Sequence, residues 1–252
     1  MRARIVAAAS GARWLLEGWN LFRAAPLPWL ALLLAYWLLM TLISLVPFVG
    51  MAIASILVPA FSVGFMAAAR ASSRRAGVEL SLLFDGFRHA QRGQLVLGVV
   101  YLFSLAIVLG GGALVDDGAL ARWMLTGRRP ADEVLQSDAF LSALVCAAAL
   151  YTPVMMMFWF APPLVAWHSA SPAKALFYSF FGCLMNWRAF IAYGAAAALV
   201  TLVAPFVLVL TLRTLLGNVS FAWLAFPLLG VLLPTLFASF YASYRDVFAS
   251  GE

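Results

Sequence analysis

Six stretches of the chain are apolar over a length that can cross a lipid bilayer, and the charged residues are concentrated between them. A transmembrane helix needs about 20 mainly apolar residues, because the hydrocarbon core is about 30 Å thick. A membrane β-barrel would instead alternate apolar and polar residues along each strand, and no stretch alternates. The sequence therefore predicts an all-α fold, a polytopic membrane bundle with six transmembrane helices. The spans are expected at 27–46, 50–69, 95–115, 140–167, 189–212 and 221–241.

Composition leads to the same class of protein. Hydrophobic residues make up 65% of the chain and charged residues 10%, whereas about 25% of the residues in soluble domains are charged. The six spans and their short connections account for the 252 residues. We therefore expect residues 1–252 to form a single integral membrane domain, with no separate soluble domain.

The distribution of basic residues predicts the orientation of the spans. With the N-terminus inside, the inner side holds twelve of the 16 basic residues and five of the 10 acidic ones. The outer side then holds four basic and five acidic residues. Because basic residues are enriched in cytoplasmic loops, we expect both termini to lie in the cytoplasm.

A threefold repeat is visible in the segments that precede the first, third and fifth spans. The segments at 11–24, 79–92 and 173–186 combine apolar and polar faces, as helices that lie in the membrane plane do. Aligned on a small residue followed by an aromatic one, they match at Gly18-Trp19, Gly86-Phe87 and Ser179-Phe180, with an acid before the first two glycines at Glu17 and Asp85. The sequence thus predicts three units, each an interfacial helix followed by a two-span hairpin.

Proline spacing gives the repeat further support. Pro59 precedes Arg70 by 11 residues, and Pro234 precedes Arg245 by 11; Pro163 and Lys174 have the same spacing. The alternative is that basic residues end the inner sides of spans in any six-span protein.

Residues 116–139 form the one long connection between spans. Its acids Asp116 and Asp117 are expected either to be solvated or to cap a short external helix that contains Trp123. Cys146 and Cys183 have neither metal-ligand spacing nor a plausible disulfide partner, so we expect small apolar packing residues.

The sequence contains no pattern of residues that is typical of a catalytic, metal-binding or ion-transport site. An ionisable residue in the middle of a span is functional by default, and no span carries one. His89 and His168 are the two histidines, they lie far apart, and no hydrolase or nucleotide-binding motif occurs. We therefore expect no catalytic residue, no cofactor, no metal site and no ion-driven pump, and we predict that the protein is not an enzyme.

Arginines crowd the connection between the second and third spans. Two interpretations are open: they serve only to orient the spans, or they form a headgroup site for anionic phospholipid, to which each basic residue contributes about 1 kcal/mol. The candidate lipid contacts are Arg70, Arg74, Arg75, Arg88, Arg92, Arg188 and Arg245.

Several segments resemble an uncharacterised family of bacterial six-span inner-membrane proteins. They are the run from Ala3 through Arg23 to Gly50, the sequence Trp187-Arg188-Ala189-Phe190, and the ending Leu233-Pro234-Thr235-Leu236-Phe237-Ala238-Ser239-Phe240-Tyr241-Ala242-Ser243-Tyr244-Arg245-Asp246. More distantly, the layout is similar to the non-catalytic membrane domain of some glycerophosphodiester phosphodiesterases. The resemblance covers nearly the whole chain and implies a multi-pass protein of the bacterial inner membrane. It implies no activity and no functional residues.

Two functions from different classes remain open. The first is a non-enzymatic protein that binds or organises anionic phospholipid, or scaffolds partners, at the inner leaflet. The second is a passive permease or channel, which a polar cavity across the whole bundle would favour. The expected partners are membrane phospholipids and no nucleic acid, while a homo-oligomer and an unidentified protein partner stay open.

Overall fold

The computed structural model describes residues 3–47, 49–216 and 221–248, and every regular element within them is a helix. No strand occurs in these ranges, so the predicted all-α class is confirmed. Six helical stretches are long and apolar enough to cross a membrane, which confirms the prediction of six spans. They are Pro26–Ser44, Gly50–Ser73, Leu80–Asp116, Asp138–His168, Trp187–Thr214 and Pro227–Phe248.

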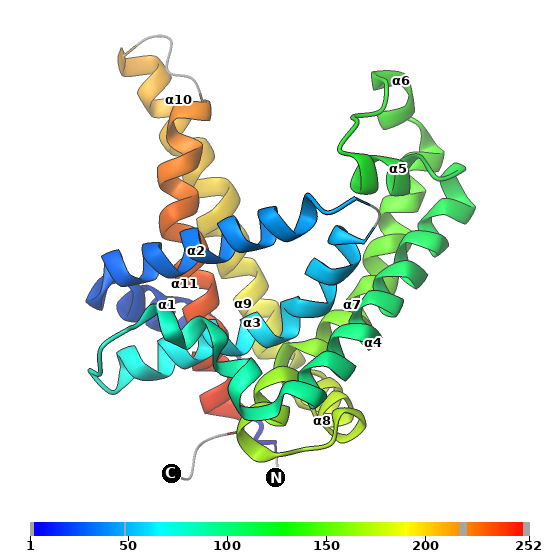
Figure 1. Cartoon of the computed structure of the whole chain (residues 1–252). Coiled ribbons are helices and arrows are strands. Elements are labelled where there is room, and N and C mark those ends of the chain that lie inside the picture. Colours follow the sequence, from blue (N-terminus) through cyan, green and yellow to red (C-terminus); the bar gives the residue numbers. More distant parts are fainter. Residues whose placement is uncertain (1–2, 48, 217–220, 249–252) are drawn as a thin grey trace.

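The first predicted unit consists of α1 (Ser10–Ala24), α2 (Pro26–Ser44) and α3 (Gly50–Ser73). Pro26 separates the first two helices. A proline has no N–H to donate to a preceding turn, and its fixed φ suits the first turn of a new helix. The short amphipathic helix therefore ends and the apolar one begins within two residues (Figure 1).

The second unit begins differently from the prediction of a separate helix at 79–92. A 3₁₀ turn, η1 (Leu80–Phe84), leads directly into the long helix α4 (Asp85–Asp116). Ala90 has non-helical backbone angles, with φ −160°, and bends α4. The amphipathic segment is thus the 3₁₀ turn plus the first turn of α4, and α7 (Asp138–His168) completes the unit.

The connection between α4 and α7 carries two short helices, α5 (Ala119–Thr126) and α6 (Asp132–Leu135). Asp116 accepts hydrogen bonds from the backbone N–H groups of Gly118 at 3.0 Å and of Leu120 at 2.7 Å. These bonds satisfy donors at the start of α5 that have no partner within the helix. Of the two alternatives expected for Asp116 and Asp117, these bonds support capping of a short helix for Asp116.

The third unit contains α8 (Pro172–Met185), α9 (Trp187–Ala198), the π turn η2 (Leu199–Val203), α10 (Ala204–Leu216) and α11 (Phe221–Phe248). The expected continuous span at 189–212 is therefore interrupted. Pro205 lacks the N–H that a regular helix would donate to the carbonyl of Thr201, and the π turn ends two residues before it, at Val203. Lys174 lies in α8, beyond the end of α7, so it does not match the span-end arginines of the other units.

The three units close into a ring. Each short helical segment packs against the second span of the preceding unit: η1 against α3, α8 against α7, and α1 against α11. The last contact joins the beginning of the chain to its end. The backbone N–H of Arg4 accordingly donates to the carbonyl of Val247 at 2.9 Å, and the last turns of α11 lie on the side opposite α5 and α6 (Figure 1).

Small residues permit the close approach of these segments. A Cβ atom added to Gly18 in α1 would overlap the carbonyl oxygen of Thr235 in α11. A Cβ atom added to Gly86 in α4 would overlap the carbonyl oxygen of Ala60 in α3. Thr235 follows Pro234 and Ala60 follows Pro59, so the two contacts are equivalent within the repeat. Glycine at such contacts lets helix backbones approach closely in membrane proteins.

Ser179 occupies the third equivalent position and makes a polar contact. Its hydroxyl accepts a hydrogen bond from the backbone N–H of Phe160 at 2.9 Å and donates to the carbonyl of Met156 at 2.7 Å. Both partners lie in α7. The three small residues aligned in the sequence therefore all lie at the ring-closing contacts.

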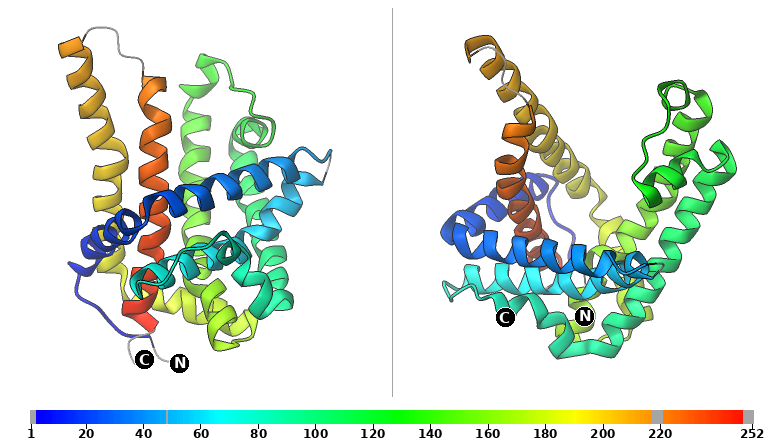
Figure 2. Two further views of the ribbon diagram at one scale, coloured as in Figure 1. Left: turned by 60° about the vertical axis from the view of Figure 1, so that its left-hand side comes forward. Right: turned by 45° about the horizontal axis from the view of Figure 1, so that its top comes forward.

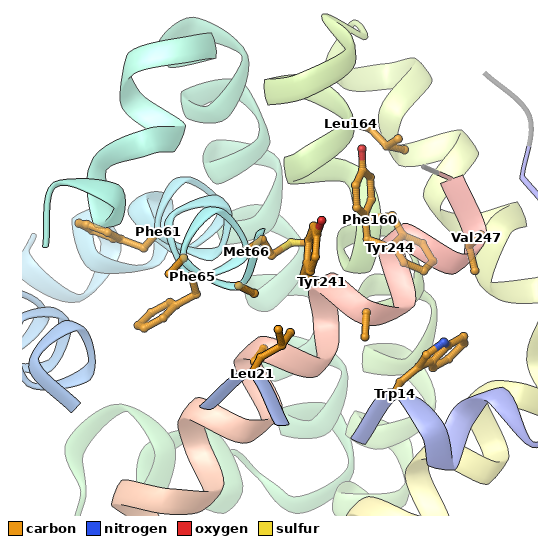
Figure 3. Close-up of a cluster of buried hydrophobic side chains, with 14 of the residues drawn as sticks. Trp14, Leu21, Phe61, Phe65, Met66, Phe160, Leu164, Tyr241, Tyr244 and Val247 are labelled. Carbon is orange, nitrogen blue, oxygen red and sulfur yellow. The ribbon is translucent and has the colours of Figure 1, made fainter. Parts of the chain in front are cut away.

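The buried core is strongly aromatic and lies where α3, α7 and α11 approach one another (Figure 3). The rings of Phe65 and Phe237 stack with centroids 4.2 Å apart, and Trp159 meets Phe240 edge-on at 4.6 Å. Such pairs contribute about 0.5–1.5 kcal/mol beyond the burial of their surface. The fully buried side chains of this core include Trp14, Trp29, Phe61, Phe65, Phe160 and Leu164.

The two-span hairpins diverge from this core. In both views of Figure 2 the α2–α3 hairpin lies across the direction of α7 and α11. Large apolar side chains on the hairpins are exposed, with Leu114 90% and Leu27 76% accessible. Contiguous apolar surface of this extent is typical of a face that contacts lipid or another protein.

Candidate anion-binding site

A cavity of about 790 Å³ lies at the end of the molecule where the chain begins and ends. Its wall is built from the N-terminal segment, the start of α1, and the last turns of α3, α7 and α11. The arginines of the wall outnumber its single carboxylate. The charged and titratable residues that line it are Arg4, Arg13, Arg70, Arg74, His168, Arg245 and Asp246.

Asn186 holds the N-terminal segment in the wall. Its side-chain oxygen accepts from the backbone N–H of Val6 at 2.8 Å, and its side-chain N–H group donates to the carbonyl of Arg4 at 2.8 Å. A further bond to the carbonyl of Gly182 measures 2.9 Å. Asn186 is 1% exposed. A buried amide with all three bonds fixes the path of the backbone that carries Arg4.

Arg13 and Arg74 reach the cavity from different helices. The guanidinium of Arg13, in the first turns of α1, donates to the hydroxyl of Ser10 at 2.7 Å. Arg74 is the residue that follows the last turn of α3, where its charge also complements the negative end of the helix dipole. Arg4, Arg13 and Arg74 form no ion pair with a carboxylate in the described ranges.

Arg245 is anchored by the chain's first helix. Its guanidinium forms a two-bonded ion pair with Glu17, with N–O distances of 2.6 and 2.9 Å, and lies 3.4 Å from Asp246. Asp246 also accepts from the indole N–H of Trp14 at 2.9 Å. These bonds connect the acid of the α1 repeat motif to the arginine at the end of α11, and they orient Arg245 along the cavity wall.

Aromatic side chains complete the wall beside the arginines. The guanidinium carbon of Arg70 lies 5.4 Å from the ring centroid of Trp167, within the range of a cation–π contact. The indole N–H of Trp167 points to Asp85 at 3.5 Å. His168 and Tyr244 share a hydrogen bond of 2.6 Å between Nε2 and the phenolic oxygen. The wall therefore combines positive charge with flat aromatic surface.

This combination suits a phosphate-bearing ligand. Guanidinium groups bind phosphate through paired N–H donors in a fixed geometry. Among the described residues, no group of three or more His, Cys, Asp or Glu side chains that could hold a metal ion is found.

The structure brings together only part of the predicted set of lipid contacts. Arg70, Arg74 and Arg245 line the cavity. The remaining predicted arginines do not line it: Arg75 lies just past α3 with φ 54°, Arg88 and Arg92 are exposed on α4, and Arg188 lies over the ring of Trp187 at 5.3 Å.

Arg4 and Arg13 were missed as individual sites by the sequence interpretation, although they were counted on the inner side. In the sequence they lie near the N-terminus, whereas Arg245 lies near the C-terminus. The repeat could have revealed these two arginines. Each short helical segment packs on the preceding unit, and because α1 has no preceding unit, a closed ring requires it to pack on the last one. That closure places Arg4 and Arg13 beside the end of α11.

A comparison with curated proteins finds one extensive similarity. Over 253 residues the chain is 39% identical to a probable inner membrane protein of Burkholderia thailandensis, and the match covers 98% of this chain and 94% of the relative. The chain belongs to the same family. Together with the six candidate spans, this membership makes it a multi-pass inner-membrane protein. No family model matches the sequence, and no solved structure matches it.

Proposed function

We propose that this protein binds anionic phospholipid through the cavity at the end of its helical ring. The observation that carries the proposal is the convergence of five arginines on one cavity, from the N-terminal segment, α1, α3 and α11. Basic pockets between membrane helices on the cytoplasmic side bind the headgroups of anionic lipids. The aromatic residues Trp167, Tyr241 and Tyr244 in the same wall suit the interfacial depth of a headgroup.

The proposal includes the orientation of the chain. With both termini in the cytoplasm, the arginine cavity opens at the inner leaflet and the α5–α6 connection lies outside. The excess of basic residues on the side of the termini supports this arrangement. A reporter fused to the C-terminus should be active only in its cytoplasmic form; activity of a periplasmic reporter there would contradict the orientation.

The proposal also assigns the protein a binding role rather than a catalytic one. The histidine and the carboxylate of the wall are both engaged, His168 with Tyr244 and Asp246 with Trp14. For the alternative role of a passive permease we find less support. The cavity is lined by residues from one end of the bundle, and the packed aromatic core borders it. The distant similarity to the membrane domain of glycerophosphodiester phosphodiesterases stays a prediction.

The test compares two triple variants that remove equal charge. In the first, Arg4, Arg13 and Arg74 of the cavity are replaced by glutamine; in the second, Arg75, Arg88 and Arg92 are replaced by glutamine. Both variants lose three positive charges on the same side of the protein. An effect of net charge or of topology on the bound lipid should therefore be the same in both. The measurement is the amount of anionic phospholipid that co-purifies with each protein.

We expect the cavity variant to lose most of its bound anionic lipid and the second variant to retain it. Equal lipid content in all three proteins would contradict the proposal. An equal loss in both variants would show that the basic surface attracts lipid without a specific site, which would also contradict it.

A further inference from the structure

The charge of the cavity wall bears on the kind of headgroup that fits. Arg245 is neutralised by its two-bonded pair with Glu17. In contrast, Arg4, Arg13 and Arg74 have no carboxylate within ion-pair distance in the described part of the chain. A monoanionic phosphodiester would balance one of these three charges and leave the others without a counter-charge.

The three arginines belong to different segments of the chain. Arg4 is fixed through its backbone by Asn186 and Val247, and Arg13 is steadied by Ser10. Arg74 follows the end of α3. They therefore reach the cavity from three segments with separate anchors, and a ligand with two phosphate groups can contact more of them than a single phosphate group can.

The size of the cavity agrees with a larger polar ligand. Pockets for drug-sized molecules have volumes of about 300–1,000 Å³, and this cavity measures about 790 Å³. One phosphate group would fill a small part of it.

From charge, placement and volume together we infer that the cavity selects a lipid headgroup that carries two phosphate groups, such as that of a diphosphatidyl lipid. This inference rests on the proposed function and specifies its ligand. One phosphate lies toward Arg13 and Ser10 on α1. The second lies toward Arg74 at the end of α3, and Arg4 lies on the N-terminal segment that borders both.

The experiment uses the full-length protein in a neutral detergent and native mass spectrometry. Tetraoleoyl cardiolipin and dioleoyl phosphatidylglycerol are added separately, at equal concentrations of phosphate. We expect cardiolipin to bind at least about fivefold more tightly, which corresponds to about 1 kcal/mol for one further arginine–phosphate contact. The double variant Arg13→Gln/Arg74→Gln should lose this preference while still eluting as a folded protein.

The control is the double variant Arg88→Gln/Arg92→Gln, which should keep the preference because neither residue lines the cavity. Equal affinity for both lipids, with both lost in the cavity variant, would overturn the inference and leave the proposed function intact. Failure of both lipids to bind would overturn both. Binding of inorganic pyrophosphate that displaces cardiolipin would support a two-phosphate site but identify a soluble ligand.

Discussion

Glu17 and Arg245 form a two-bonded ion pair that joins the first helix of the chain to the last. Their side chains are 31% and 38% exposed. The pair closes the ring of three units beside the basic cavity. Glu17 is the acid of the first repeat motif, and Arg245 lies 11 residues after Pro234 in the last span.

The first prediction concerns the strength of this pair. Exposed ion pairs contribute about 0.2–1 kcal/mol, and a two-bonded geometry lies toward the upper end. We expect a double-mutant cycle of Glu17→Gln and Arg245→Gln to give a coupling near this upper value in the free energy of unfolding. The matched control is Arg129 with Asp132, a more exposed pair in the connection between α4 and α7. A coupling no larger than that of the control would show that the pair does not stabilise the ring closure.

The second prediction concerns the glycines at the ring contacts. Gly18→Ala and Gly86→Ala should each destabilise the protein by about 1–3 kcal/mol, because the added methyl group meets backbone that cannot move aside easily. Gly110→Ala is the control, since a Cβ atom there meets nothing within 4 Å. The control should be neutral or stabilising, because alanine favours helix over glycine. Thermal unfolding in detergent provides the comparison, and three equal responses would argue against the close contacts.

The third prediction concerns Asn186. Asn186→Ala removes the side-chain bonds to the part-buried backbone groups of Val6 and Arg4, and a hydrogen bond of this kind contributes about 1 kcal/mol to stability. We expect faster hydrogen exchange at the Val6 amide and a less firmly positioned backbone at Arg4. Asn20→Ala changes an exposed asparagine in α1 and should leave exchange at Val6 as it is. Unchanged exchange in the Asn186 variant would mean that this side chain does not hold the segment.

The fourth prediction uses the two free cysteines. Cys183 in α8 is 3% exposed, and burial raises the pKa of its thiol. Because the thiolate is the reactive form, a raised pKa lowers the reactive fraction at any given pH below it. In a Cys146→Ser background, Cys183 should react slowly with a water-soluble maleimide from neutral to mildly alkaline pH, and quickly in denaturant. An added Ser73→Cys, at an exposed site, is the positive control. Fast labelling of Cys183 in the native protein would contradict its burial.

The sequence was sufficient for the class of fold because the bilayer imposes a strict length on apolar helices. It also contained the repeat, since Gly18, Gly86 and Ser179 are required to be small at equivalent contacts. The bend at Ala90 and the π turn before Pro205 were not predicted, although the missing N–H of Pro205 gives the π turn a local cause. Two of the five arginines of the candidate site were missed because their position depends on tertiary packing. Arg4 and Arg13 reach Arg245 only through the ring closure, which local patterns of hydrophobicity do not encode.

The most direct test of the account is an experimental density map of the protein purified with lipids of its own membrane. We predict density for a phosphate-bearing headgroup in the cavity, within hydrogen-bond distance of the guanidinium groups of Arg13 and Arg74. A cavity that holds only water, with ordered headgroups instead around Arg88 and Arg92, would contradict the account.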